Sequence, residues 1–376
     1  MVMKNPFVYT STVDGESFCN RKQELQDLTD FCLDGQNVFI YAHRRCGKTS
    51  LIKVLLDQLY KTNPEIKTFY IDLYGTLDER DFIASIFSSF SQVETKLEKL
   101  AKTMKSLFSN VRPKLSYNPD NNKIEVEASY NPGENIPVFN EVVESLGRYS
   151  ETTGAVVVFD EFQEIDDYGD KTIEKRLRKV IQHHRNVCYI FMGSQRRMLE
   201  QMFTEKSRAL YNMATSYPLS QIATGHYRRW IKGLFRKYDK NPPTDEVIDD
   251  VVNACENHPL FVQQFFYFLW KEPDITSKVV NQIEEKILDR RYLEYANIWD
   301  KLTPNQKKAC ILLFKFGGEN IYQVKNFQQV GLKGSSQVKK AIEYLIDNEI
   351  VYRNGIYRFS DVMFKKWIMR LASNRK

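Results

Sequence analysis

Short apolar runs alternate with amphipathic segments over the first 220 positions of the chain. The runs have the length of strands and occupy residues 37–41, 67–73, 155–159 and 187–192. The last two are continuously apolar, which is typical of parallel strands covered on both faces. Between them, apolar residues recur at helical spacing over residues 16–33, 48–60, 80–107 and 138–149. This alternation predicts a parallel α/β sheet with flanking helices.

Two further patterns follow the α/β rhythm. Residues 113–130 hold two alternating runs around an Asn/Pro/Asp cluster, which predicts a β-hairpin insertion. From about residue 225 to about 299 only helical patterns remain, which predicts a small all-α domain.

The last segment predicts a winged helix-turn-helix. Thr303 and Pro304 are typical of the N-cap and first position of a helix, and the Asn-Gly pair at 354–355 is typical of a tight hairpin turn. Three helices, at 303–316, 321–330 and 335–347, precede that hairpin. With 376 residues the chain exceeds one core, and we expect domains at 1–222, 223–300 and 301–376.

Composition excludes several classes of protein. Hydrophobic residues make up 42% and charged residues 27%, so disordered, collagen-like and disulfide-scaffold chains are excluded. The most apolar stretch, residues 260–270, is too short to span a membrane, and no secretory signal precedes it. Six scattered cysteines favour a cytoplasmic protein with reduced thiols and no zinc site; neither a membrane partner nor a metal at His183-His184 is expected.

Charge is distributed unevenly along the chain. Residues 301–376 contain 15 Lys and Arg against 5 Asp and Glu, a balance of +10, and the whole chain carries +6, so the remainder carries −4. A basic end on a mildly acidic chain indicates a module that faces a polyanion.

Residues 42–49, AHRRCGKT, follow the phosphate-loop pattern G-x-x-x-x-G-K-[ST] with Ala42 in place of the first glycine. An apolar strand precedes them and a helix follows. Lys48 would bridge phosphate oxygens and Thr49 would bind Mg²⁺. The other loop residues expected around the phosphates are His43, Arg44, Arg45, Cys46, Gly47 and Ser50. The alternative is a chance Gly-Lys-Thr at a helix start.

Acidic and polar residues end the next two apolar runs. Asp160 is expected to hold Mg²⁺ and Glu161 to orient the attacking water, although an acidic pair can also cap a strand end. Ser194 is expected to contact the γ-phosphate or the water, with a helix N-cap as the alternative. One of Arg196, Arg197 and Arg208 could act as an arginine finger, but surface arginines are the simpler interpretation.

Taken in order, these segments resemble the archaeal-type ATPase family of STAND NTPases, which are relatives of the AAA+ class. The resemblance rests on FCNR at 18–21, HRRCGKTSL at 43–51, VVVFDEFQEI at 156–165, FMGSQ at 191–195, SRALY at 207–211, NHPLFVQ at 257–263 and DVMFKKW at 361–367. It implies an α/β P-loop NTPase with a helical lid and a winged helix, binding ATP and Mg²⁺ between core and lid and hydrolysing ATP slowly as a switch.

The same resemblance places four more residues near the nucleotide. Phe18 and Arg21 would flank the adenine, and His258 with Pro259 would place the lid, although Pro259 also suits the first position of a helix. Asn257 departs from the family's lid glycine. No sensor 2 arginine is recognised in the lid, which suits STAND proteins better than hexameric motors or a replication-initiator-like DNA loader.

The winged helix leaves two partners open. Gln337, Lys339 and Lys340 on its third helix, and Arg353 and Arg358 on its wing, occupy positions that contact duplex DNA in such modules. Winged helices also dock proteins, and Glu343 shares the presented face. A nucleotide-dependent scaffold with negligible turnover, and a protein partner or homo-oligomer, are therefore alternatives to a DNA-binding switch. ATP rather than GTP follows from the family resemblance alone.

Overall fold

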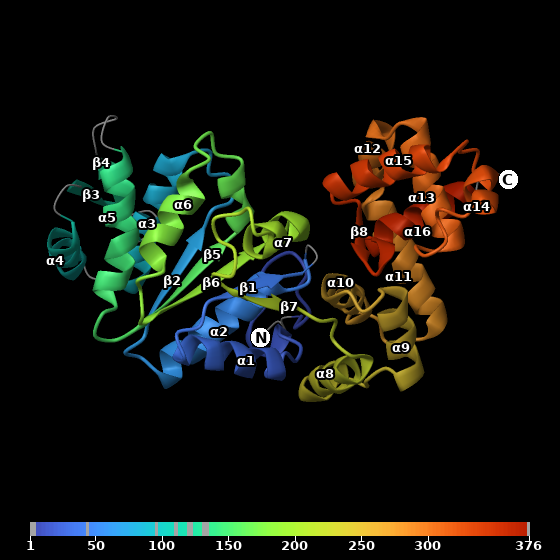
Figure 1. Ribbon diagram of the computed structural model, residues 1–376. Coiled ribbons are helices and arrows are strands. Elements are labelled where there is room, and N and C mark those ends of the chain that lie inside the picture. The colour runs from blue at the N-terminus through green and yellow to red at the C-terminus, as the bar shows by residue number, and fades with distance from the viewer. Residues whose placement is uncertain are drawn as a thin grey trace. The chain divides into compact units, whose positions relative to one another are not determined.

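The computed structural model describes residues 5–42, 45–94, 97–108, 112–118, 123–129 and 135–373 (Figure 1). The chain forms two compact units, described separately. Residues 21–220 form the α/β unit, whereas the segment before Arg21 and the chain from Gln221 onward form the helical unit. The predicted division into three domains remains a prediction.

A parallel five-stranded sheet organises the α/β unit, which confirms the predicted fold class. Its strands lie in the order β2-β5-β6-β1-β7. Their bounds are β1 Val38–Tyr41, β2 Lys67–Asp72, β5 Ala155–Asp160, β6 Val187–Gly193 and β7 Thr215–Pro218. The edge strand β7 was not predicted, because its residues are mostly exposed and carry no apolar alternation.

Helices cover both faces of this sheet (Figure 1). They are α1 (Lys22–Leu33), α2 (Lys48–Thr62), α3 (Glu79–Val93), α4 (Leu97–Leu107), α5 (Asn135–Tyr149), α6 (Ile173–Ile181) and α7 (Arg196–Thr204). Alternate strand residues, among them Phe69, Phe159 and Phe191, enter one core with α3, α5, α6 and α7. Figure 1 shows α1 and α2 on the other face.

Two helix predictions were wrong in their extent. The single helix predicted over 80–107 is two helices, because Glu94 adopts extended backbone at φ −112° and ψ 99°. The first helix begins at Lys22 rather than residue 16. Asn20 and Arg21 both have left-handed backbone, with φ of 56° and 78°, which cannot continue a right-handed helix.

The predicted hairpin insertion is confirmed. Strands β3 (Arg112–Asn118) and β4 (Lys123–Ser129) pair antiparallel between α4 and α5 in the chain. The turn between them lies outside the described residues.

The helical unit begins with an all-α part and ends in a winged helix, as predicted. The first part comprises α8 (Thr224–Lys237), α9 (Asp245–Ala254), α10 (Pro259–Leu269), α11 (Ser277–Arg290) and α12 (Tyr292–Lys301). The second comprises α13 (Pro304–Phe316), α14 (Val324–Gln329), α15 (Ser335–Asp347), β8 (Val351–Asn354), β9 (Ile356–Phe359) and α16 (Val362–Ser373). Thr303 is the N-cap of α13, with Pro304 at the first position, as the sequence predicts.

One hydrophobic cluster runs through both parts of the helical unit. Trp367 of α16 packs against Trp299 and Tyr295 of α12, with ring centroids 6.2 and 6.1 Å apart. The N-terminal segment joins the same cluster through Phe7, whose ring lies 5.2 Å from that of Trp230. None of the helices in the described ranges combines the length and the apolar character that crossing a membrane requires.

Candidate functional site

The phosphate loop joins the end of β1 to the start of α2. Ala42 is buried and lacks a left-handed φ, so alanine serves there without backbone strain. Gly47 has a φ of 89° immediately before the helix, a conformation that glycine adopts at least cost. Arg45 also lies in the left-handed region, at φ 63°. His43 and Arg44 lie outside the described residues.

Lys48 begins α2 and folds back over the loop. Its side chain is buried, and Nζ donates a hydrogen bond to the Ala42 carbonyl at 3.2 Å. Thr49 and Ser50 follow it in the first helical turn. Backbone N–H groups in a first turn have no acceptor within their own helix, so this end of α2 presents donors and a positive dipole to an anion.

Asp160 ends β5 beside this helical turn. Its Oδ2 accepts hydrogen bonds from Thr49 Oγ1 at 3.3 Å and from the Tyr70 hydroxyl. Burial raises the pKa of the Asp160 carboxyl, the hydrogen bond from Tyr70 opposes this, and the charges of Glu161 and Asp72 raise it further. Asp72 is its register partner on β2. The cluster therefore carries negative charge that its own residues do not compensate.

The donor set of this cluster suits Mg²⁺. A threonine hydroxyl and a carboxylate are hard oxygen ligands, and Mg²⁺ in phosphate sites takes its remaining ligands from water and the nucleotide. Among the described residues, no group of three or more His, Cys, Asp or Glu side chains could hold a metal alone. Thr49 with Asp160 matches the smaller protein contribution that a nucleotide-bound metal needs.

Glu161 follows Asp160 with a left-handed φ of 50°. Its Oε2 accepts hydrogen bonds from Ser194 N at 3.0 Å, Ser194 Oγ at 2.9 Å and Gln163 Nε2 at 2.7 Å. The structure thus brings Ser194 to Glu161. Ser194 is not the N-cap of α7, because Gln195 occupies that position. Gln163 is a site residue that sequence reasoning missed, and its spacing along the chain gives no signal that would have identified it.

The Arg21 side chain contacts the backbone of the phosphate loop. Its side chain is buried, and Nη2 lies 3.5 Å from the Cys46 carbonyl oxygen. Nη1 donates to Glu24 Oε1 at 2.6 Å and to the Ser220 carbonyl. Within the α/β unit this guanidinium therefore braces the loop.

The other predicted residues belong either to the helical unit or to ion pairs within the α/β unit. Phe18, His258 and Pro259 belong to the helical unit, where Pro259 takes the first position of α10 and His258 its N-cap. Two of the three arginines weighed as fingers are engaged in ion pairs within the α/β unit. Arg208 contacts Asp166 and Glu174, and Arg196 lies 3.2 Å from Glu200.

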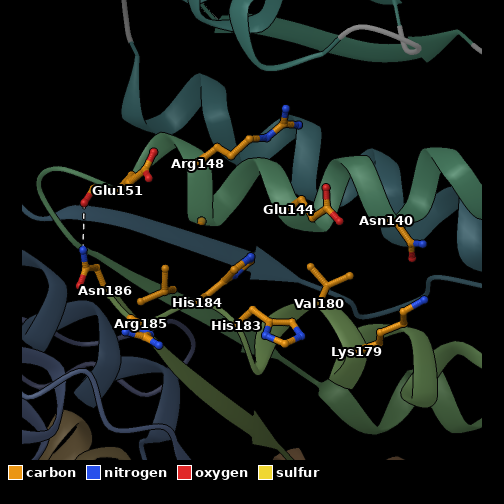
Figure 2. A pocket seen from close by; sticks show the side chains of 12 residues that line it. Asn140, Glu144, Arg148, Glu151, Lys179, Val180, His183, His184, Arg185 and Asn186 are labelled. Atoms are coloured by element: carbon orange, nitrogen blue, oxygen red, sulfur yellow. Dashed lines mark hydrogen bonds between the residues drawn. The ribbon is translucent and has the colours of Figure 1, made fainter.

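A surface pocket of about 640 Å³ lies at the opposite, amino-terminal ends of β5 and β6. Figure 2 shows its lining from α5 on one side and from residues 179–187 on the other. His184 Nδ1 lies 2.7 Å from the Tyr189 hydroxyl, and burial lowers the pKa of His184 to about 4. Asn186 donates to the Glu151 carbonyl across the rim. The pocket is therefore separate from the phosphate loop.

The five residues predicted to bind DNA lie on α15 and the β8–β9 hairpin. Lys340, Arg353 and Arg358 are exposed, and Lys339 is exposed with Nζ 3.8 Å from Glu343. The Gln337 side chain forms an intramolecular hydrogen bond, in which its Oε1 accepts from Lys333 N at 2.9 Å. Arg353 stacks on the Tyr357 ring, 5.3 Å from its centroid.

The parallel sheet, the phosphate loop and the acidic end of β5 define a P-loop ATPase, here joined to a winged helix. Residues 18–265 match a family described as an ATPase domain predominantly from Archaea, and residues 293–370 match a probable winged helix domain. The first match covers more than half of the chain, so the chain belongs to this ATPase family.

Solved structures share this fold. A Walker-type ATPase of Pyrococcus abyssi is 16% identical, with a TM-score of 0.69 over 97% of this chain and 99% of that chain. The ORC2 protein of Aeropyrum pernix, in ADPNP–ADP complexes, is 11% identical, with a TM-score of 0.57 over 99% and 98%. At such identities the likeness concerns the fold alone. No curated protein matches the chain.

Proposed function

We propose that this ATPase is a Mg²⁺-dependent, slowly hydrolysing switch of the STAND type. The observation that supports it most is the convergence, at the carboxyl ends of β1, β5 and β6, of four groups. They are the Lys48 ammonium, the Thr49–Asp160 oxygen pair, the Glu161 carboxylate and the Ser194 hydroxyl. Phosphoryl transfer needs positioning and charge stabilisation at one point, and these groups can supply both.

Each group has a distinct task in this proposal. Lys48 neutralises charge on the β- and γ-phosphates while the N–H groups of the first turn of α2 bind their oxygens. Thr49 and Asp160 would hold Mg²⁺, which would neutralise negative charge on the nucleotide. Glu161 accepts the proton of the attacking water, and Ser194 holds Glu161 in place from the end of β6.

Slow turnover and a switch role rest on the resemblance to STAND NTPases, carried by the order of motifs along the chain. We expect turnover below the enzyme median of about 10 s⁻¹, with the ATP-bound and ADP-bound states as the two settings of the switch. Scattered cysteines suit a reducing, cytoplasmic setting.

Duplex DNA is the second candidate partner, through the winged helix. Its support is the set of exposed cations on α15 and the wing, Lys339, Lys340, Arg353 and Arg358, together with the +10 balance of residues 301–376. Positive charge on the third helix and wing of such a module suits phosphate contacts. Docking of a protein or of a second copy is the outcome to expect if DNA does not bind.

The metal requirement is tested by following ATP hydrolysis while free Mg²⁺ is varied. We expect no hydrolysis in excess EDTA and recovery when Mg²⁺ is restored in excess over the chelator. Asp160→Ala should shift recovery to higher Mg²⁺ concentrations, whereas Asp57→Ala, on the exposed face of α2, should leave it unchanged. Hydrolysis at full rate in EDTA would overturn the proposed metal dependence.

A further inference from the structure

Gln163 lies in the 3₁₀ turn Phe162–Asp166 that follows Glu161, and its side chain is only 2% exposed. Its Nε2 donates to Glu161 Oε2 at 2.7 Å, with a longer contact of 3.5 Å to Glu164 Oε1. Its Oε1 is buried and has no hydrogen-bond partner in the described part of the chain. The amide is therefore satisfied only on the side that faces the two carboxylates.

Such a half-satisfied amide does not serve the stability of the fold. A buried polar atom without a partner costs free energy that an apolar side chain of the same shape avoids. Methionine has nearly the volume of glutamine and would avoid that cost. The bond to Glu161 is what glutamine adds at this position.

The neighbouring strand leaves room for this amide. Gly193 ends β6 directly before Ser194, and a Cβ built on Gly193 would lie 1.9 Å from Gln163 Oε1. Any larger residue at 193 would displace the amide from Glu161. The position of the glutamine amide in the turn after β5 therefore depends on glycine at the end of β6.

We propose that Gln163 is a positioning residue for Glu161, seated against Gly193. Together with Ser194 it holds Oε2, so that the carboxylate keeps one orientation and offers its other oxygen, Oε1, to the attacking water. The inference rests on the proposed function of Glu161 as the group that accepts the proton. Gln163 thereby acts in hydrolysis by orienting Glu161, and Gly193 leaves the space that the Gln163 amide needs.

The test compares Gln163→Met with the wild type in the full chain, using steady-state ATP hydrolysis, ATP binding by calorimetry and thermal unfolding. We expect kcat to fall about 10- to 100-fold, the range for small misplacements of reacting groups. KM and ATP affinity should stay unchanged, and the melting temperature should stay equal or rise. A merely structural glutamine would instead show a lowered melting temperature with unchanged kcat.

Gln264→Met is the matched control. Gln264 in α10 is also buried with an Oε1 that lacks a partner among the described residues, yet it belongs to the other unit. Its replacement should leave kcat unchanged. Gly193→Ala provides a second route: it keeps the amide but displaces it, so kcat should fall with ATP affinity intact. Added to Gln163→Met it should cause little further loss, since both changes break the same hydrogen bond.

The outcomes separate this inference from the proposed function. Wild-type kcat in both Gln163→Met and Gly193→Ala, with Glu161→Gln inactive, would overturn the positioning role and leave the role of Glu161 standing. Wild-type kcat in Glu161→Gln would remove the proposed function itself. If Gln163→Met fails to fold, the loss of kcat at intact ATP affinity in Gly193→Ala decides the matter.

Discussion

Asp160 carries a negative charge that its surroundings disfavour. Its carboxyl is buried at the end of β5, with Asp72 beside it and Glu161 next in the chain, and burial raises its pKa. A cation among these oxygens would relieve the repulsion, as would removing the charge. The residue that we propose to hold Mg²⁺ should therefore lower the thermal stability of the nucleotide-free protein.

We predict that Asp160→Asn raises the melting temperature of the nucleotide-free protein at pH 8. Because the folded pKa lies above the ordinary value of 3.8, the wild type loses stability as pH rises from there through the folded pKa. Each kcal/mol is worth about 2–4 °C in a protein of this size class. The advantage should vanish below about pH 4. Thermal unfolding across pH measures it, with Asp57→Asn as control; a lower melting temperature at pH 8 would contradict it.

Residues of the site differ in how far sequence predicts them. Lys48, Thr49, Asp160 and Glu161 follow directly from the ends of strands, because parallel strands bring their carboxyl ends to one edge. Tyr70 and Gln163 could not be chosen this way. Their contacts depend on side-chain packing across β2, β5 and β6, which no spacing along the chain encodes.

At the scale of elements, α5 lies close to the turn that leads into β6. His184 fits against Gly147 of α5, where a Cβ would lie 2.6 Å from the imidazole ring. Its ring bonds to the buried Tyr189 hydroxyl within the pocket of Figure 2. Exposed charged or titratable residues line the same pocket: His183 and Lys179 on one side, and Arg148, Glu144 and Glu151 on the other. The imidazole thus packs there in its neutral form.

We predict that stability falls as pH decreases from about 6.5 to about 4, because burial lowers the pKa of His184 to about 4 and the unfolded chain binds the proton first. The loss due to this residue should be about 1–2 kcal/mol after allowance for solvent screening. His184→Gln should flatten that part of the profile in denaturant unfolding, whereas His183→Gln should not. An unchanged slope in His184→Gln would contradict the prediction.

Elements were predictable where burial imposes a pattern. The inner strands β1, β5 and β6 were found because their residues are apolar on both faces, and β2, at one edge, because its buried residues Phe69 and Ile71 alternate with less buried ones. The edge strand β7 was missed because it is polar, and the break after α3 because no glycine or proline marks it. There the buried Glu94 accepts a hydrogen bond from the Tyr149 hydroxyl and pairs with Lys99 at 2.8 Å, so tertiary contacts end the helix.

For the whole molecule, net charge overstates the basic face of the winged helix. Lys365, Lys366 and Arg370 of α16 pair with Glu256 in the turn after α9 and with Glu284 and Asp289 of α11, at distances of 2.5–2.7 Å. Three of the 15 cations in residues 301–376 thus hold α16 within the helical unit. The exposed cations of α15 and the wing, in contrast, are available to a partner.

We predict that Lys339→Ala combined with Lys340→Ala weakens binding to duplex DNA on all sequences alike, because phosphate contacts carry no sequence information. The slope of log K against log salt should flatten by about 0.9 for each phosphate that the variant no longer neutralises. Fluorescence anisotropy of the full chain, with and without ATP, measures both. Lys102→Ala with Lys105→Ala, on α4 of the other unit, removes the same charge and should leave the slope unchanged. No affinity at 50 mM salt in either state would assign the winged helix to protein docking.

Whether the acidic end of β5 performs hydrolysis is decided by the activity of Glu161→Gln, measured beside its affinity for ATP. The amide cannot accept a proton, but Lys48, Thr49 and Asp160 remain to bind nucleotide and Mg²⁺. We predict wild-type ATP affinity by calorimetry with hydrolysis lowered about 10²–10⁴-fold, whereas Lys48→Ala should lose the affinity itself. A Glu161→Gln protein that hydrolyses ATP at the wild-type rate would show that this carboxylate only ends a strand, and would contradict the proposed function.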